Sequence, residues 1–138
     1  MSNELKIVPL EQPAWDVIGG GINDYNIQKA GPDNSQNLCF VLQNSEGETV
    51  GGIIGATFWT WFSINLMWIQ EEYRSKGYGH QLLLTAEEEA RKRGAKNAHL
   101  DTLSFQAPDF YKKHGYQVFG KLDHFPEGHT RYFLKKDL

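Results

Sequence analysis

Two cations and two glycines are grouped in the segment RSKGYG, residues 74–79. It follows an apolar run that ends in LMWIQ and precedes a leucine-rich run, HQLLLTAEEEARKRG. The first run favours a strand and the second a helix, so the segment is predicted to be a loop at a helix N-terminus. Such a terminus presents unpaired N–H groups and the positive end of the helix dipole, and glycine lets an anion approach the backbone closely. The local pattern fits a phosphate-binding loop and a plain tight turn equally well.

Two other phosphate-binding signatures do not account for this chain. The P-loop pattern Gly-x4-Gly-Lys-Ser/Thr does not occur in the sequence. The segment DVIGGGIND, residues 16–24, has two of the glycines of a dinucleotide fingerprint but lacks the third. It also lies inside a predicted helix rather than after a strand. A dinucleotide site is therefore disfavoured.

Composition excludes several classes of protein. The chain has 138 residues, 40% hydrophobic content and a net charge of −3, which is ordinary for a globular domain and argues against nucleic acid as a partner. Cys39 is the only cysteine, so neither an intrachain disulfide nor a cysteine-based zinc site can form. Its apolar setting in LCFVL predicts a buried thiol rather than a nucleophile. Without an 18-residue apolar run or a signal-like N-terminus, we expect no membrane association and a cytoplasmic location.

The elements that must position the loop can be read from periodicity and turn residues. The predicted strands are Lys6–Leu10, Leu38–Gln43, Thr49–Thr60, Ser63–Ile69, Asn97–Leu103, Tyr116–Leu122 and Thr130–Lys136. The predicted helices are Val17–Gln28, which Gly19–Gly21 weaken or split, His80–Arg93 and Pro108–His114. Gly47 is expected to turn the first hairpin with a positive φ.

This order predicts an α+β fold in one domain, residues 1–138. The segment Ser63–Leu103 should form a parallel, right-handed strand–helix–strand crossover, with RSKGYG at its first turn. On the helix, Leu82, Leu83, Ala86 and Ala90 are predicted to face the core, with Glu87, Glu88 and Arg91 on the opposite side.

Two segments together resemble the GNAT N-acetyltransferase family. The run LMWIQEEYRSKGYGHQLLLTAEEEARKRGAKNAHLDT is similar to the family's central Arg/Gln-x-x-Gly-x-Gly/Ala motif. The run FQAPDFYKKHGYQVFG is similar to its next motif, in which a polar residue and Ala precede a helix that carries Tyr. The resemblance spans nearly the whole chain. It implies a twisted, mostly antiparallel mixed sheet with helices on both faces and a V-shaped splay between two central parallel strands.

The resemblance also implies acetyl-CoA as co-substrate, with no metal. Its pyrophosphate would lie on the loop formed by Arg74, Ser75, Lys76, Gly77, Tyr78, Gly79 and His80. Its pantetheine arm would pair with main-chain groups of Met67, Trp68 and Ile69. Gln106 occupies a polar position that contacts or orients the cofactor in the family, where Asn is frequent.

Tyr111 matches the family tyrosine that protonates the departing CoA thiolate. A phenol with a pKa of about 10 stays protonated at neutral pH and can donate to a thiolate whose acid has a pKa of about 8.5. The alternative is that Phe110 and Tyr111 are core aromatics of a short helix.

The general base is harder to assign. Some family members carry a Glu on the strand before the glycine loop, but SINLMWI has no carboxylate. Asp101 on the facing strand is the first candidate and Asp24 a weaker one. Asp101 could equally be a structural hydrogen-bond acceptor, and an amine that arrives already deprotonated needs no base.

Aromatic and histidine residues leave further alternatives open. Trp59 and Trp61, expected on one strand face, could form an apolar wall of the acceptor pocket, sheet core or a homodimer contact. His124 and His129 flank FPEG in the closing hairpin, where turn residues are favoured over a metal site with Glu127.

The sequence therefore predicts an N-acetyltransferase that moves acetyl from acetyl-CoA to a primary amine, of a small molecule in the first instance. The attack would be direct, since no Cys or Ser lies in a triad-like setting. A protein lysine or N-terminus as acceptor, and a catalytically silent acyl-CoA-binding module, are the alternatives.

Overall fold

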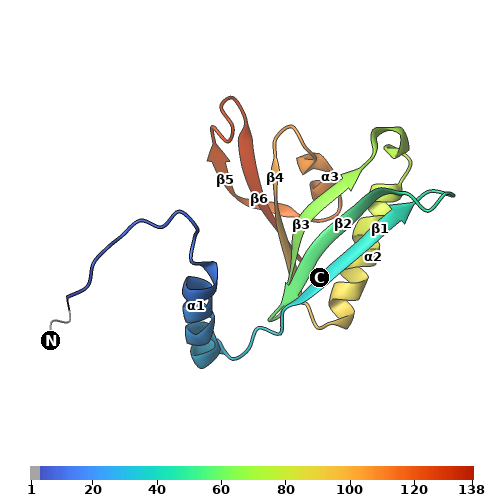
Figure 1. Ribbon diagram of the computed structural model, residues 1–138. Helices are drawn as coiled ribbons and strands as arrows, with labels where there is room; N and C mark the ends of the chain where they lie inside the picture. Colours follow the sequence, from blue (N-terminus) through green and yellow to red (C-terminus); the bar gives the residue numbers. More distant parts are fainter. Residues whose placement is uncertain (1–3) are drawn as a thin grey trace. The chain divides into compact units, whose positions relative to one another are not determined.

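The computed structural model describes residues 4–138 and divides into two compact units (Figure 1). The first unit ends at Asp33 and the second comprises Asn34–Leu138. The sequence-based expectation of a single domain over residues 1–138 stays a prediction.

The N-terminal unit contains one helix, α1 (Trp15–Ala30). Gly19, Gly20 and Gly21 do not interrupt it, so the anticipated split is wrong, and the segment that resembled a dinucleotide fingerprint is helical. The helix ends at Gly31. Its φ of +80° is a conformation that glycine adopts without strain, and its N–H donates to the Ile27 carbonyl over 2.9 Å. The predicted strand Lys6–Leu10 is also wrong, because these residues join no ladder and an extended segment becomes a strand only when another backbone pairs with it.

The second unit is a mixed six-stranded sheet with helices, as expected for an α+β fold. Its strand order is β1-β2-β3-β4-β6-β5. The strands are β1 (Gln36–Gln43), β2 (Thr49–Phe58), β3 (Trp61–Ile69), β4 (Asn97–Leu103), β5 (Gln117–Asp123) and β6 (Thr130–Asp137). A 3₁₀ turn η1 (Glu71–Tyr73) and helix α2 (Tyr78–Lys92) join β3 to β4, and α3 (Pro108–Lys113) lies between β4 and β5. Gly47 turns the first hairpin with a φ of +79°, as predicted.

The two central strands, β3 and β4, pair over a short stretch only and then diverge. β3 and β4 are parallel, as the crossover predicted, but they pair only at Trp61↔Asn97, Phe62↔Ala98 and Ser63↔His99. β4 continues along β6 as far as Leu103↔Arg131, and β3 continues along β2 as far as Gly51↔Ile69. The expected V-shaped splay is therefore present (Figure 1).

A β-bulge accompanies the splay. Ile54 pairs with Leu66 and Gly55 with Ile64, which leaves Asn65 as an extra residue on β3. A Cβ atom on Gly55 would overlap the Ser63 carbonyl oxygen, so only glycine allows β2 and β3 to approach this closely beside the bulge. The bulge bends β3 where it leaves β4.

One face of the sheet carries the core, where α2 packs. Its fully buried members come from the sheet and from α2, and include Leu38, Ile53, Phe62, Leu83, Ala86, Ala90, Ala98 and Leu134. The strand alternation that turns Leu38 inward turns Cys39 outward, and Cys39 is exposed. The prediction of a buried thiol is wrong for this reason.

A buried carboxylate on α2 contradicts the prediction of which helix face meets solvent. Glu87 was expected on the solvent side, but it is fully buried between the turns of Leu83 and Ala90. Lys136 Nζ donates to both Glu87 carboxylate oxygens over 3.0 Å, and the Tyr116 hydroxyl donates to Oε2 over 2.7 Å. These partners lie 29 and 49 residues further along the chain, so the local pattern could not reveal them.

We expect Lys136→Met to destabilise the protein by about 3–5 kcal/mol, because it leaves the buried Glu87 carboxylate without its cation. Urea unfolding at neutral pH measures this loss. The double variant Lys136→Met/Glu87→Met should recover part of it, since both charges are then removed while the Tyr116 hydroxyl loses its acceptor. A double variant less stable than Lys136→Met alone would contradict this account.

Candidate active site

The loop that follows β3 places free donors at the start of α2. Ser75 and Gly77 have positive φ values of 61° and 87°, and Gly77 is the residue before the helix. The first helical hydrogen bond runs from Gln81 N–H to the Gly77 carbonyl over 3.1 Å. The N–H groups of residues 78–80 precede that bond and are not used within the helix. The loop therefore leaves these backbone donors available to an anion, and its binding of the pyrophosphate stays a prediction.

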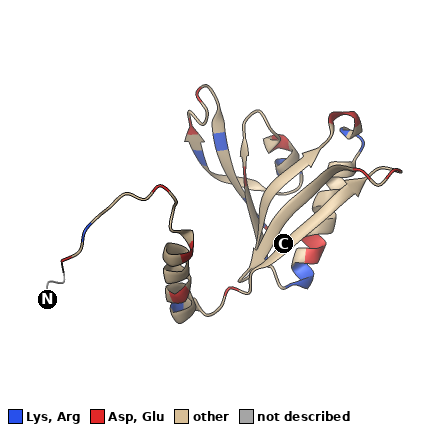
Figure 2. Ribbon diagram, viewed as in Figure 1, with Lys and Arg blue, Asp and Glu red and all other residues tan. Residues whose placement is uncertain are grey.

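Charges of both signs surround this loop. Arg74 and Lys76 are exposed, and the acidic Glu71 and Glu72 precede them in η1 (Figure 2). Arg74 Nε donates to the Ile69 carbonyl at the end of β3 over 2.7 Å. This bond uses one guanidinium donor to join the loop to the strand and leaves the terminal nitrogens for a ligand.

Gly79 lets α2 lie close to α3. A Cβ atom at this position would be 3.2 Å from Phe110 Cε1 and 3.5 Å from Ile69 Cδ1. Gly77, in contrast, has no such neighbour within 4 Å and is needed for its positive φ. The two glycines thus have different roles, one in packing and one in backbone geometry, which spacing alone did not separate.

A histidine pair also joins α2 to α3. His80 Nδ1 and His114 Nε2 are 2.8 Å apart, and His114 Nδ1 is 2.8 Å from the Phe110 carbonyl oxygen. The carbonyl can only accept, so a neutral His114 donates from Nδ1 and accepts from His80 at Nε2. His80 was predicted from the loop motif, whereas His114 was not, since only the packing of α3 brings it here.

The predicted strand for the pantetheine arm has one free edge. Met67, Trp68 and Ile69 pair with β2 on one side, and the β3–β4 ladder has already ended on the other. The Ile69 carbonyl already accepts from Arg74, and the other outward main-chain groups of this stretch remain available to an extended ligand that adds to the sheet.

Tyr111 of α3 reaches this strand. Its hydroxyl donates to Met67 Sδ over 3.7 Å, and its side chain is buried. Burial raises the pKa of Tyr111 to about 12. A phenol is already protonated at neutral pH with its ordinary pKa of about 10, and burial extends this protonated range to more alkaline pH.

Gln106 makes contacts within its own turn. Its Oε1 accepts from Leu103 N–H over 2.8 Å and from the Thr102 hydroxyl over 3.2 Å. The Gln106 side chain therefore orders the connection from β4 to α3, and its amide nitrogen remains for a ligand. A direct cofactor contact stays a prediction.

Asp101 has a cationic partner. Arg131 Nε donates to Asp101 Oδ1 over 3.0 Å, and a terminal guanidinium nitrogen of Arg131 forms an ion pair with the same oxygen at 3.0 Å. Asp101 lies on β4 beyond the point of the splay, paired with Phe133 of β6. The ion pair supports the structural alternative for Asp101, while its role as general base stays a prediction.

An aromatic hollow lies beside the point where β3 and β4 separate. It is lined by Phe58, Trp61, His99, Phe119 and Lys135. Burial lowers the pKa of His99, against a weaker opposing effect of Asp101. Its five residues come one from each of the five strands β2 to β6, so the sequence analysis did not bring them together.

The expectation that Trp59 and Trp61 share a strand face is wrong. β2 ends at Phe58, and Trp59 lies in the tight turn before β3 with a φ of 49°. Phe58 takes the predicted place beside Trp61, and its ring is 6.5 Å from the His99 ring.

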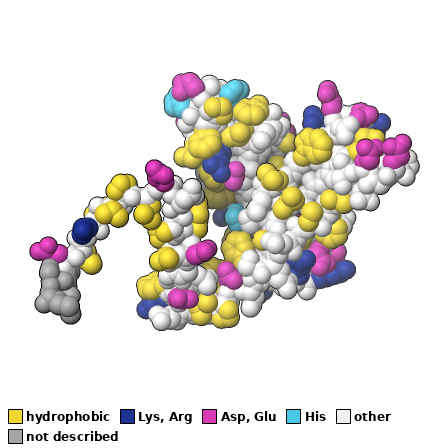
Figure 3. All heavy atoms as spheres, viewed as in Figure 1, with side chains coloured by type: hydrophobic (Ala, Val, Ile, Leu, Met, Phe, Trp, Pro, Cys, Tyr) yellow, Lys and Arg dark blue, Asp and Glu magenta, His cyan; other side chains and the backbone are white. Residues whose placement is uncertain are grey.

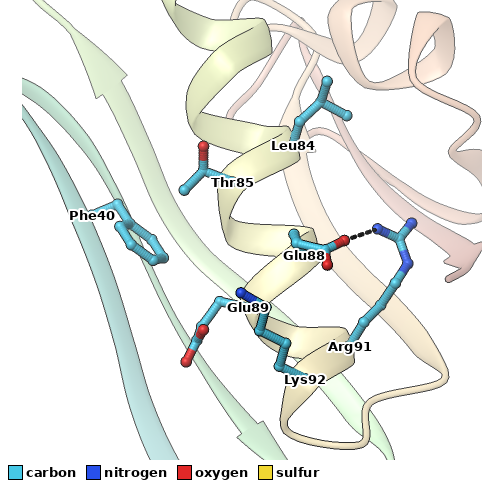
Figure 4. A pocket seen from close by; sticks show the side chains of 7 residues that line it. All are labelled: Phe40, Leu84, Thr85, Glu88, Glu89, Arg91 and Lys92. Atoms are coloured by element: carbon cyan, nitrogen blue, oxygen red, sulfur yellow. Dashed lines mark ion pairs between the residues drawn. The ribbon is translucent and has the colours of Figure 1, made fainter.

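A shallow groove between α2 and β1 contains none of the predicted site residues. Figure 4 shows Phe40 of β1 across from the side of α2 that carries Thr85 and Glu89. Leu84, Glu88, Arg91 and Lys92 of α2 also line the groove, and Glu88 and Arg91 are paired over 3.5 Å. Its charged side chains belong to the solvent side of the helix.

The remaining histidines belong to the closing hairpin. His124 Nδ1 is 3.3 Å from Glu127 Oε1, and the His129 ring stacks edge-on against Phe105. Across residues 4–138, no group of three or more His, Cys, Asp or Glu side chains could hold a metal ion. Over the same residues, no helix is long and apolar enough to span a membrane.

Comparison of the chain with known proteins identifies its family. Residues 35–118 match the acetyltransferase (GNAT) domain. An acetyltransferase of Agrobacterium fabrum is 32% identical over 81% of this chain and 82% of its own, and blasticidin-S acetyltransferase of Streptomyces morookaense is 36% identical over 67% and 68%. The crystal structure of an acetyltransferase from Bacillus cereus has a TM-score of 0.89 and 33% identity, and covers 96% of this chain and 98% of its own.

The chain belongs to the GNAT acetyltransferase family. It is an acyltransferase that depends on acetyl-CoA, as the resemblance of its two motifs to this family implied.

We expect Gly79→Ala to destabilise the protein by about 1–3 kcal/mol, because the new methyl group crowds Phe110. Urea unfolding measures the change. Combining it with Phe110→Leu should restore part of the loss, and a double-mutant cycle gives the coupling. Strict additivity of the two changes would show that Phe110 is not the obstacle.

The raised pKa of Tyr111 predicts how stability depends on alkaline pH. Between pH 10 and about 12 the unfolded chain loses this phenolic proton while the folded chain keeps it, so stability falls as pH rises. In Tyr111→Phe the fall should be smaller by about 1.4 kcal/mol for each pH unit in this window. Urea unfolding of both proteins at several alkaline pH values tests this. Parallel declines would contradict a raised pKa.

Proposed function

We propose that the protein acetylates a primary amine of a small molecule by direct attack within a ternary complex. The observation that carries the proposal is the Tyr111 hydroxyl, which reaches Met67 on the free-edged part of β3. A proton donor and an open strand edge thus meet at one point of the splay.

In this proposal, different residues would bind different parts of acetyl-CoA. The N–H groups of residues 78–80, with Arg74 and Lys76, would hold the pyrophosphate. The free main-chain edge of Met67, Trp68 and Ile69 would hold the pantetheine arm, which directs the thioester into the splay between β3 and β4. Gln106 would orient the arm from the β4–α3 connection.

The reaction needs one nucleophile and one proton donor. The acceptor nitrogen attacks the thioester carbonyl carbon, the C–S bond breaks, and Tyr111 gives its proton to the departing sulfur. The acylated nitrogen still carries its extra proton and loses it to solvent or to a base, and the Tyr111 phenolate takes up a proton from solvent, which restores the acid. No covalent enzyme intermediate is required, and Cys39 is exposed on β1 rather than at the splay.

The acceptor amine must lose a proton, and this is the step to which the side chains of the site contribute least. A primary amine with a pKa of about 10.4 costs roughly 4–5 kcal/mol to deprotonate at pH 7. β3 has no carboxylate, and Asp101 is engaged by Arg131. We therefore favour an acceptor with a lowered amine pKa, or proton removal through water with Asp101 as its first candidate acceptor.

A small-molecule acceptor is supported by the relative from Streptomyces, which acts on blasticidin-S. The aromatic hollow of Phe58, Trp61 and Phe119 offers an apolar wall for part of such a molecule. A cytoplasmic location, where acetyl-CoA is made and used, is part of this proposal.

We expect Tyr111→Phe to lower kcat by about 100-fold or more, because the departing thiolate loses its proton donor. Release of free CoA with a panel of small amines measures kcat. The control is Tyr132→Phe, which removes the hydroxyl of a partly buried tyrosine on β6 and should keep near-normal turnover.

Thermal unfolding separates binding from catalysis. At 100 times its Kd, acetyl-CoA should raise the melting midpoint of both variants by roughly 3–6 °C, and NADH should not. Stabilisation without turnover for any amine would favour the silent acyl-CoA-binding module. Unchanged kcat in Tyr111→Phe would remove its role as the acid.

A further inference from the structure

A directed chain of hydrogen bonds joins the glycine loop to the helix that carries Tyr111. The Phe110 carbonyl oxygen can only accept, so His114 Nδ1, which is 2.8 Å away, donates in that bond. A neutral His114 then accepts at Nε2, and His80 Nδ1, also 2.8 Å away, donates to it. The direction of both bonds is therefore set by the carbonyl next to Tyr111.

The same residues are packed against each other as rings. The His80 and His114 ring centroids are 5.0 Å apart, and those of His114 and Phe110 are 4.6 Å apart. Phe110 also lies against Gly79, where an added Cβ atom would be 3.2 Å from its ring. Close-packed groups transmit strain to their neighbours because they are hard to compress. A shift of the loop at Gly79 and His80 is therefore passed to Phe110 and to the adjoining Tyr111.

Helix α3 depends on such contacts because it is too short to be stable alone. It has six residues and no side-chain cap at its start. The Tyr111 hydroxyl donates to the Met67 sulfur over 3.7 Å, and a thioether sulfur is a weak acceptor. Within residues 4–138, the His80–His114 bond is the only side-chain hydrogen bond that joins residues 108–114 to α2. The position of the hydroxyl therefore depends on how α3 is held against α2.

The loop end of this chain lies where a ligand can reach it. The His80 side chain is exposed, and the N–H groups of residues 78–80 are not used within the helix. Figure 3 shows basic and acidic side chains beside each other at the end of the second unit where this loop lies, and Arg74 and Lys76 are exposed. A pyrophosphate bound to the loop would restrain His80, at one end of the chain of bonds.

We propose that the His80–His114 bond couples occupancy of the glycine loop to the placement of the Tyr111 hydroxyl, with His114 as a positioning residue. This inference rests on the proposed roles of the loop and of Tyr111. The bound pyrophosphate fixes the loop, His80 fixes His114, and His114 fixes the carbonyl beside the acid. Neither histidine needs to touch the thioester. Binding energy from a remote part of the cofactor is thereby used at the reacting sulfur.

Two acyl donors test the coupling, since acetyl-CoA has the pyrophosphate and acetyl-pantetheine lacks it. His114→Phe keeps a ring but has neither nitrogen, so it should lower kcat with acetyl-CoA by about 10-fold or more. The rate with acetyl-pantetheine should be unchanged, because an unoccupied loop has nothing to transmit. His114→Gln, whose amide has both a donor and an acceptor, should retain most of the rate. The control is His129→Phe in the closing hairpin, which should not alter the rate with either donor.

An equal loss with both donors, or no loss with acetyl-CoA, would overturn the coupling. His80→Phe breaks the same bond from its exposed side, which covers the case in which His114→Phe does not fold. The double variant His80→Phe/His114→Phe should be no slower than the slower single variant, because one bond is lost in all three. Adding His114→Phe to Tyr111→Phe should cost nothing further, since the acid is already absent. Additive losses in either cycle would overturn the proposal.

A measurement without turnover separates this inference from the proposed function. The probe is 3′-phospho-ADP, the nucleotide half of CoA, which has the diphosphate but no pantetheine arm. Its binding should shift the NMR signal of a ¹³C-labelled Tyr111 ring in the wild type but not in His114→Phe. A shift without turnover of any amine would contradict the transferase proposal alone. Turnover that depends on Tyr111, together with an unmoved signal or no binding of the probe, would overturn the coupling alone.

Discussion

The active site depends on a parallel ladder that stops after three residue pairs. β3 and β4 pair only from Trp61 to Ser63, after which each strand follows its outer neighbour, β2 or β6. The bulge at Asn65 and the close approach at Gly55 bend β3 away from β4. The open edge beyond Ser63 is both the consequence of this geometry and the surface that receives the cofactor in our proposal.

Where β3 and β4 separate, the strands no longer hold each other, and contacts made by α2 stabilise the arrangement instead. Glu87, Lys136 and Tyr116 join α2, β6 and the residue before β5 through one fully buried carboxylate. Such a group is costly unless paired, so its partners hold these elements in a definite arrangement. At the other end of α2, Gly79 lies against Phe110 and His80 meets His114. The loop that would bind the pyrophosphate and the helix that carries Tyr111 are thereby fixed relative to each other.

The same architecture accounts for what the site lacks as well as what it has. Burial raises the pKa of Tyr111, and Asp101 is joined to Arg131. In the proposed mechanism the chain would thus provide for the leaving group more fully than for the nucleophile. The acceptor's own amine chemistry would then be a determinant of which substrates react.

Motifs and periodicity predicted the order and type of nearly all elements of the second unit, the glycine loop, and the family with its co-substrate. These features depend on local backbone preferences, such as the positive φ at Gly77, or on residue types at short spacing. Tertiary structure alone decided the burial of Glu87, the exposure of Cys39, the turn at Trp59, the His80–His114 pair and the unpaired state of Lys6–Leu10. The physical reason is that each depends on a partner distant in the chain: a buried charge needs its cation, and a strand needs a neighbouring backbone.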